Sequence, residues 1–179
     1  MHGLVSLLDQ EHTATVEHLW MELEMQYGLT GIKVTPFPHF SWLIAADFNW
    51  ERLSEVLAEI AAKTKPFSVH TTGLALFTGE QPVVYIPVVR DGKLSALHES
   101  IWEQVTAVGM EISPLYNPQT WMPHISLAYV DVTRENIDCV MQHLVFHSYD
   151  WQIRIDNITA IYEPTGTIGE IRYTYGFTT

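Results

Sequence analysis

The chain has 179 residues, of which 47% are hydrophobic, and its 21 acidic and 9 basic residues give a net charge of −12. This length and apolar content suit one packed domain, or two small lobes that share a core, and exclude extended disorder. Long nucleic acid is bound largely through basic patches. Because no basic run exceeds the loose Lys63/Lys65 pair, a long nucleic-acid partner is not expected, whereas a small substrate with one or two phosphates is.

Cysteine usage and the N-terminal residues indicate where the protein works. Cys139 is the only cysteine, which excludes an internal disulfide and is typical of a reducing compartment. Its place in a helical apolar pattern predicts a packed core thiol. We find no signal-peptide pattern over 1–9 and no run of the roughly 18 apolar residues that a membrane span needs. A cytoplasmic protein with no membrane partner is therefore expected.

Hydrophobic spacing in the first half of the chain predicts the order strand, helix, strand, helix, strand. A short strand over 4–8 precedes a helix whose apolar residues recur at helical spacing. A loop rich in turn residues over 28–38 leads to a strand that starts near His39. Asn49 is a suitable N-cap for the second helix, and a long strand over 67–77 ends this half.

The second half repeats this order of elements. A strand over 83–89 precedes a helix, and a loop over 109–122 leads to a strand that starts near His124. Thr133 is expected to cap the helix that follows. A strand over 151–162 then corresponds to the long strand of the first half.

Corresponding features of the two halves are separated by a nearly constant number of residues. The two predicted N-caps are 84 residues apart (133 − 49 = 84), and the apolar stripes of the helices behind them share this offset. Such agreement predicts an internal repeat over about 3–80 and 82–165. The remaining residues, 166–179, supply a final strand over 168–177, and the whole chain, 1–179, is expected to form a single bilobal domain.

The pattern Pro-His-x-Ser occurs once in each half, and its two histidines are 85 residues apart (124 − 39 = 85). Because side chains alternate along a strand, His39 and Ser41 point to one face of the first motif strand, and His124 and Ser126 do so in the second. Two imidazoles and two hydroxyls presented in this way suit acid–base chemistry on a phosphate ester. We expect an α+β fold in which two antiparallel-rich sheets, with helices outside, face a central cleft lined by both motifs.

In these motifs and in its order of elements, the sequence resembles the 2H phosphoesterase superfamily. This family is named for two His-x-Ser/Thr motifs on a duplicated fold, and it includes bacterial RNA 2′,5′-ligase-like proteins and cyclic nucleotide phosphodiesterases. The resemblance covers essentially the whole chain. One Pro-His-x-Ser would be weak evidence, whereas two at equivalent points of a repeat are specific.

The resemblance implies an enzyme of the cyclic phosphodiesterase type. His39 and His124 would be the general base and general acid, in an order that the sequence leaves open, and Ser41 and Ser126 would hydrogen-bond the phosphate oxygens. The implied substrate is a 2′,3′-cyclic phosphate or a 2′,5′-phosphodiester of a small nucleotide or related compound. No metal or other cofactor is expected, and a reversible 2′,5′ RNA ligase activity is within the range of the family.

The chain departs from the ligase-like members, which often carry an arginine five residues after the second histidine and a basic loop before it. Here those positions hold Tyr129 and the uncharged segment 116–121, so a mononucleotide-sized substrate is favoured. Tyr116 and Trp121 could stack on a base, with packing of the loop as the equal alternative. Simple alternation sets Tyr129 on the face opposite His124, which favours core packing over substrate contact unless a bulge re-aims it.

Two other functions are compatible with the sequence. A noncatalytic nucleotide-binding module would retain the cleft without turnover. A metal hydrolase would use His143 and His147, which are four residues apart on a predicted helix. Since no third ligand is apparent in the sequence, a solvated helix face is the preferred interpretation. His70 and His98 are expected to be ordinary strand and helix residues.

Overall fold

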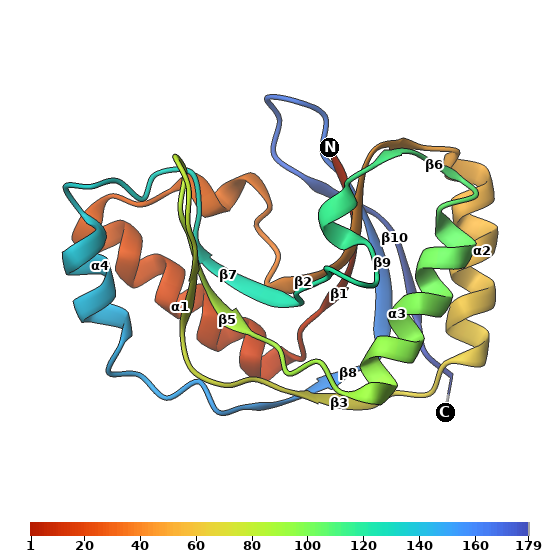
Figure 1. Ribbon diagram of the computed structural model, residues 1–179, viewed down its shortest axis with the longest axis horizontal. Coiled ribbons are helices and arrows are strands. Elements are labelled where there is room, and N and C mark those ends of the chain that lie inside the picture. The colour runs from red at the N-terminus through yellow and green to blue at the C-terminus, as the bar shows by residue number, and fades with distance from the viewer. Residues whose placement is uncertain (179) are drawn as a thin grey trace.

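The computed structural model describes residues 1–178 and, within them, contains ten strands, four α-helices and two 3-10 helices (Figure 1). The helices are α1 (Gln10–Tyr27), α2 (Trp50–Lys63), α3 (Gly92–Val105) and α4 (Ile137–Leu144), and the 3-10 helices are η1 (Gly31–Val34) and η2 (Pro114–Tyr116). The strands are β1 (His2–Leu7), β2 (His39–Phe48), β3 (Phe67–His70), β4 (Ala75–Phe77), β5 (Val83–Pro87), β6 (Gly109–Ile112), β7 (His124–Ala128), β8 (Gln152–Ile155), β9 (Asn157–Tyr162) and β10 (Glu170–Gly176).

Two antiparallel sheets form the body of the molecule. The larger has five strands in the order β10-β9-β1-β2-β6, and the smaller has three in the order β4-β5-β7. Helices α2 and α3 pack on the larger sheet and α1 packs on the smaller one, with α4 beside α1 (Figure 1). The motif strands β2 and β7 lie next to each other where the sheets meet. The expected α+β fold, with two antiparallel sheets and helices outside, is confirmed.

Each lobe combines elements from both halves of the chain. Helix α1 follows β1 of the larger sheet but packs on the smaller one, and α3 follows β5 of the smaller sheet but packs on β2. Strands β3 and β8, which are 85 residues apart (152 − 67 = 85), pair with each other in a third, two-stranded sheet, with Phe67 opposite Ile155 and His70 opposite Gln152. Related halves pair in this way about a two-fold axis, so the pairing supports the internal repeat that we infer.

Two long strands predicted from the sequence are each split in the structure. Residues 67–77 form β3 and β4, which are separated by a turn in which Gly73 has a φ of 61°. Residues 151–162 form β8 and β9, which belong to different sheets. The expected loop over 109–122 instead contains β6, at the edge of the larger sheet, and η2. Each break marks the point where the chain passes from one sheet to another. Pairing with distant strands decides this change, so the local sequence did not reveal it.

Helix α4 begins later than predicted. Its N-cap is Asn136, and the hydroxyl of Thr133 instead accepts a hydrogen bond from the backbone N–H of Glu135. Val140 and Leu144 form the buried side of the helix, so Cys139 is exposed and the prediction of a core thiol was wrong. Among the described residues, no helix is long and apolar enough to cross a membrane.

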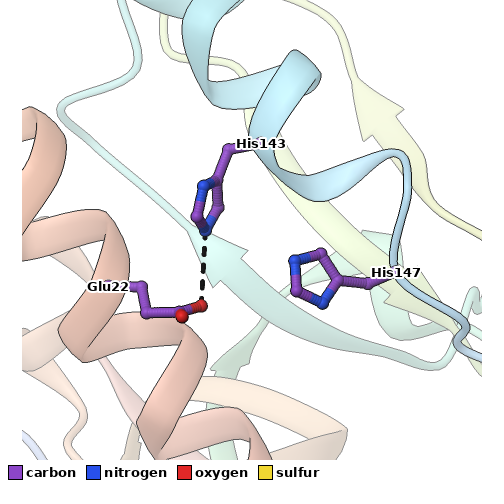
Figure 2. Close-up of side chains that lie close together, drawn as sticks. All are labelled: Glu22, His143 and His147. Atoms are coloured by element: carbon purple, nitrogen blue, oxygen red, sulfur yellow. Dashed lines mark hydrogen bonds and ion pairs between the residues drawn. The ribbon is translucent and has the colours of Figure 1, made fainter.

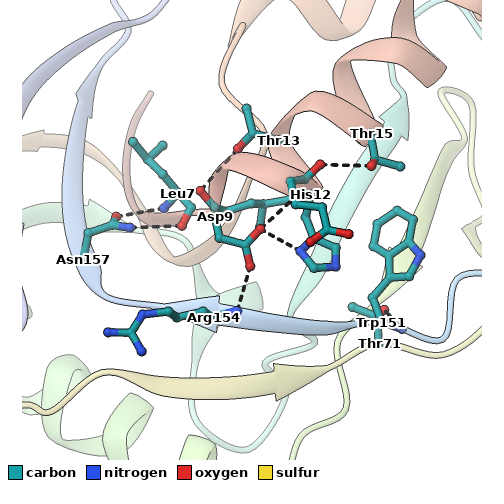
Figure 3. Close-up of polar contacts among 11 residues, drawn as sticks. Leu7, Asp9, His12, Thr13, Thr15, Thr71, Trp151, Arg154 and Asn157 are labelled. Carbon is teal, nitrogen blue, oxygen red and sulfur yellow. Dashed lines mark hydrogen bonds and ion pairs between the residues drawn. The ribbon is translucent and has the colours of Figure 1, made fainter.

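Polar side chains fasten the start of α1 to the strands around it (Figure 3). One carboxylate oxygen of Asp9 caps α1 by accepting the N–H of His12 at 3.0 Å, and the other accepts the N–H of Arg154 in β8 at 2.9 Å. The side-chain amide of Asn157 bonds both the N–H and the C=O of Leu7, at 2.9 and 3.0 Å. Such a cap is worth about 1 kcal/mol. Together these bonds hold β1, the neighbour of the first motif strand, against β8 and β9.

Candidate active site

The two motif histidines are the first residues of their strands and are held in the same way. In His39, ring Nδ1 is hydrogen-bonded to the backbone carbonyl of Phe37, and in His124 the same atom is 2.7 Å from the carbonyl of Met122. A carbonyl only accepts hydrogen bonds, so Nδ1 carries the proton in both rings. Each neutral imidazole therefore has Nε2 as its proton acceptor.

Each motif strand contains a β-bulge directly after its serine. Trp42 is the extra residue where β2 pairs with β1, and Leu127 is the extra residue where β7 pairs with β5. A bulge shifts the alternation of side chains by one residue. Tyr129 therefore lies on the same side as His124 and is 39% exposed. The expectation that Tyr129 packs in the core was wrong, because the bulge turns it toward the motif side chains.

Burial lowers the pKa of both motif histidines, which favours their neutral forms at neutral pH. Burial lowers the pKa of His39 to about 4, a shift that is opposed by its hydrogen bond to Phe37 and assisted by the charge of His124. Burial also lowers the pKa of His124, against the effect of its hydrogen bond to Met122. His39 and His124 begin β2 and β7, which are in contact where the sheets meet, so we treat the two histidines as one candidate site.

The helix η2 contributes Tyr116 to this site, where Tyr116 lies near Ser41 and Tyr129. The hydroxyl of Tyr116 in η2 lies near the side chain of Ser41. Burial raises the pKa of Tyr116 to about 12, against the effect of the nearby Ser41 hydroxyl, and the nearby Tyr129 raises it further. Tyr116 therefore keeps its proton, and its hydroxyl can donate a hydrogen bond at the point where Ser41 faces the site.

Trp121 is buried next to the first motif strand and contacts its residues Ser41 and Trp42. Its ring is 2% exposed and lies parallel to His98, with ring centroids 3.8 Å apart, and it also stacks on Trp42 at 5.6 Å. Its indole N–H donates to the backbone carbonyl of Ser41 at 2.9 Å. A ring covered in this way has no free face for a base, so its burial favours the packing alternative. His98, on α3, is likewise completely buried.

The second motif is supported by another tryptophan. Trp20 of α1 donates its indole N–H to the carbonyl of Ser126 at 3.1 Å. Each motif serine is therefore held at its backbone by a tryptophan from a distant part of the sequence, and each serine side chain is half-buried. Ser41 and Tyr129 both lie near Tyr116, whereas Trp121 contacts Ser41 only at its backbone carbonyl.

Two hollows open beside the motif histidines. The one next to His124 has a volume of about 320 Å³, and its wall includes the aromatic rings of Phe77 and Tyr116. Phe77 contacts His124 edge to face, at 4.9 Å between ring centroids. A hollow of about 70 Å³ next to His39 includes Thr35 in its wall. The sequence offered no signal for Phe77 or Thr35, because each reaches the site only through sheet pairing or loop packing.

A close backbone contact fixes the end of β7. The carboxylate of Asp131 accepts the backbone N–H groups of Thr30 and Gly31, both at 2.6 Å. A Cβ atom at Gly31 would lie 2.1 Å from the carbonyl oxygen of Tyr129, which no side chain could tolerate. The following residue, Val130, has a φ of 76°, an unfavourable value for a β-branched residue. Glycine at position 31 is thus needed for the chain to present Tyr129 where it does.

Among the described residues, the group of side chains suited to hold a metal ion lies outside this site. It consists of Glu22, His143 and His147. The site around His39 and His124 offers two neutral imidazoles, two serine hydroxyls and two phenols, which together can move protons and donate hydrogen bonds to a phosphate group.

Two His-x-Ser strands, meeting at the junction of two antiparallel sheets, define a protein of the two-histidine phosphoesterase class. A model of the 2′-5′ RNA ligase superfamily matches residues 32–166, well over half of the chain. The chain belongs to this superfamily, the 2H phosphoesterases, and the expected family is confirmed. No curated protein sequence matches the chain.

Solved structures share the fold over nearly the full length. TT0787 of Thermus thermophilus is 16% identical, with a TM-score of 0.65, and the match covers 98% of this chain and 97% of that one. Escherichia coli LigT, solved with 3′-AMP, is 14% identical, with a TM-score of 0.62 and coverage of 99% and 98%. LigT solved with NADP⁺ is 13% identical, with a TM-score of 0.57 and the same coverage. At these identities the likeness establishes the fold.

Proposed function

We propose that this protein hydrolyses a 2′,3′-cyclic phosphate or a 2′,5′-phosphodiester of a small nucleotide, with His39 and His124 as the acid–base pair and without a metal ion. The observation that carries the proposal is the matched presentation of the two rings. Both have Nδ1 bonded to the carbonyl two residues earlier, which leaves Nε2 as the atom that exchanges protons. The exposed single cysteine is compatible with the cytoplasm as the place of action.

In the proposed reaction, one of the two histidines acts as the base and the other as the acid. A bound phosphate anion raises the pKa of a nearby imidazole, so one ring takes up a proton when the substrate binds. The histidine that stays neutral accepts a proton from water as the water oxygen bonds to phosphorus. The protonated histidine donates its proton to the ribose oxygen as the bond of that oxygen to phosphorus breaks, and the products are a phosphomonoester and a free hydroxyl.

Hydroxyl groups would stabilise the charge that develops on the phosphate oxygens. Ser41 and Ser126 flank the histidines on the same strand faces, and the hydroxyl of Tyr116 lies near Ser41. Donors already oriented toward developing charge stabilise a transition state more than the ground state. This arrangement needs no Lewis acid, because the protein's own donors meet the charged oxygens.

The hollow beside His124 supports a substrate of mononucleotide size. Its volume of about 320 Å³ and its Phe77 and Tyr116 rings suit a stacked base. The family member LigT was solved with 3′-AMP and with NADP⁺, and we extend small-nucleotide binding to this chain by that likeness. The net charge of −12 makes long RNA a poor partner.

The test is turnover of the four nucleoside 2′,3′-cyclic phosphates and of 2′,5′-linked dinucleotides in excess EDTA. We expect hydrolysis by the wild type, and loss of it by His39→Ala and His124→Ala variants that retain the wild-type circular dichroism. The position of the phosphate in the product reports which ribose oxygen leaves. Nucleotide binding without any turnover would refute the proposal and favour a noncatalytic binding module. Loss of turnover in EDTA by a protein that keeps its circular dichroism spectrum would favour a metal hydrolase.

A further inference from the structure

We propose that Glu22, His143 and His147 form a binding site for a divalent transition-metal ion, of which Zn²⁺ is the type (Figure 2). Glu22 lies on α1, His143 on the last turn of α4, and His147 in the turn that follows α4. The sequence suggested the two histidines but no third ligand. Nothing in the sequence pointed to Glu22 as a ligand, because it is 121 residues away from His143 and reaches it only through the packing of α1 and α4.

The distances are close to those of a metal site. One ligand atom from each of the three residues lies within 4.8 Å of the other two, and Nε2 of His143 is 3.3 Å from Oε2 of Glu22. Zinc binds imidazole nitrogen and carboxylate oxygen at about 2.0–2.2 Å, so its ligand atoms lie roughly 3.4 Å apart in a tetrahedral site. One pair already has this spacing. The third ligand needs a shift on the order of 1 Å, which a side-chain rotation of the more exposed His147 supplies.

The chemistry of the three residues also suits such an ion. Two imidazoles and one carboxylate are a ligand set that zinc uses when it keeps an open fourth position. The side chains of Glu22 and His143 are only 24% and 15% exposed, so part of their hydration is already lost. The carboxylate offsets one of the two charges of the ion, and the acidic chain attracts cations. A simple hydrogen bond would explain why His143 and Glu22 lie close together, but it would not explain the position of His147. The ring of His147 points toward the space between the other two side chains (Figure 2).

Further groups could orient the ligands and complete the coordination. Nε2 of His18, one turn before Glu22 on α1, is 3.4 Å from the second carboxylate oxygen, Oε1. Such a partner fixes the orientation of a ligating carboxylate. A hollow of about 210 Å³ is lined in part by His18, Glu22 and His147, which leaves room for a water molecule at the fourth position.

A bound ion would tie α4 to α1 and so stabilise the smaller lobe. Helix α1 packs on β7, and its Trp20 holds the carbonyl of Ser126. The three ligands lie outside the motif strands, so this site is separate from the proposed hydrolytic site, and the two proposals can fail independently.

The experiment is titration of the metal-free protein with Zn²⁺ by calorimetry and with Co²⁺ by visible absorption, together with thermal unfolding. We expect one ion per chain, a Co²⁺ spectrum of four- or five-coordinate geometry, and a rise in Tm of about 5–10 °C at a free Zn²⁺ concentration 100-fold above Kd. Glu22→Gln and His143→Gln should weaken binding at least 100-fold, and His147→Gln at least 10-fold. His18→Gln should weaken it by about 10-fold.

Two controls separate this site from other histidines. His70→Gln removes an exposed histidine on β3 and should leave affinity unchanged, and a His39→Ala/His124→Ala double variant should still bind one ion. Each variant is compared with the wild type in EDTA, where equal Tm values show that the fold is intact. Unchanged affinity in the Glu22, His143 and His147 variants, or loss of binding in the double variant, would overturn the proposal.

Discussion

The two motif strands present the same groups in different surroundings. In both, Nδ1 of the histidine is bonded to a carbonyl two residues earlier, a bulge follows the serine, and a tryptophan holds the serine carbonyl. Yet β2 lies inside a five-stranded sheet, whereas β7 is the edge of a three-stranded one. His39 adjoins a hollow of about 70 Å³, and His124 adjoins an aromatic one of about 320 Å³. The comparison teaches that the local geometry of each motif strand presents the same histidine and serine. The sheets and hollows around the two strands then make the two histidines differ in the space beside them.

The largest expected effect comes from removing either imidazole. His39→Ala and His124→Ala should each lower kcat by about 10²–10⁴-fold, since positioned acid–base groups contribute that much. If His39 is the base, its variant loses the acid limb of the pH–rate profile, and the His124 variant loses the alkaline limb. Profiles of kcat against pH for both variants, with His70→Ala as the control, test this. The reverse pattern would exchange the two roles.

The second prediction concerns a constraint found at β7. Gly31→Ala should lower the free energy of unfolding by about 2–4 kcal/mol, because the new Cβ meets the carbonyl of Tyr129 and one of the two backbones must shift. Turnover should fall as well, since Tyr129 moves. The matched control is Gly92→Ala, where a Cβ meets nothing within 4 Å. Urea unfolding of both variants decides the matter, and equal stabilities would contradict the contact.

The third prediction tests the support beneath β2. His98 is fully buried, and burial lowers its pKa to about 4, against a hydrogen bond to Trp42 and with help from the charge of Arg90. Because this value lies below the unfolded value of 6.5, the unfolded chain binds the proton first as the pH falls. Stability is therefore lost between about pH 6.5 and 4, by at most about 3 kcal/mol from this residue, and is unaffected above that range.

His98→Gln retains a donor for the carbonyl of Trp42 and removes the titrating ring. The free energy of unfolding of this variant, measured in urea from about pH 4.5 to 7.5, should depend less steeply on pH than that of the wild type. The slope remaining in the variant includes His39, whose lowered pKa acts with the same sign. An unchanged slope would show that His98 does not titrate in this range.

The smallest expected effects separate the two serines. Ser41→Ala and Ser126→Ala should each lower kcat by roughly 10–100-fold, because each removes a hydrogen-bond donor to the phosphate. In the Ser41 variant, Tyr116→Phe should cause little further loss of kcat, since the two hydroxyls are neighbours. In the Ser126 variant, Tyr116→Phe should cause its full loss of kcat. A double-mutant cycle on kcat measures this coupling. If the loss from Tyr116→Phe adds fully in both serine variants, Tyr116 is not coupled to Ser41 and the predicted difference between the two serines is wrong.

Much of the fold could be predicted from the sequence, and the failures occur where distant partners act. The alternation of His39 and Ser41 along their strand, and the order of helices and strands, follow from local spacing of side chains. For Tyr129, alternation alone favoured core packing, because the bulge that re-aims it depends on the pairing of β7 with β5. For Trp121 the sequence left base stacking and loop packing as equal alternatives, because its burial against His98 and Trp42 depends on contacts among three separate segments.

The sequence by itself determined the family, the element order and the four motif side chains, because strand periodicity and a repeated tetrapeptide are local properties. Only the tertiary structure decided the split of two predicted strands, the exposure of Cys139 and the meeting of Glu22 with His143 and His147. It also decided that the pKa of both motif histidines is lowered, since burial is a property of everything that packs around a residue. Short-range patterns specify which groups a strand offers, and long-range packing specifies what those groups meet.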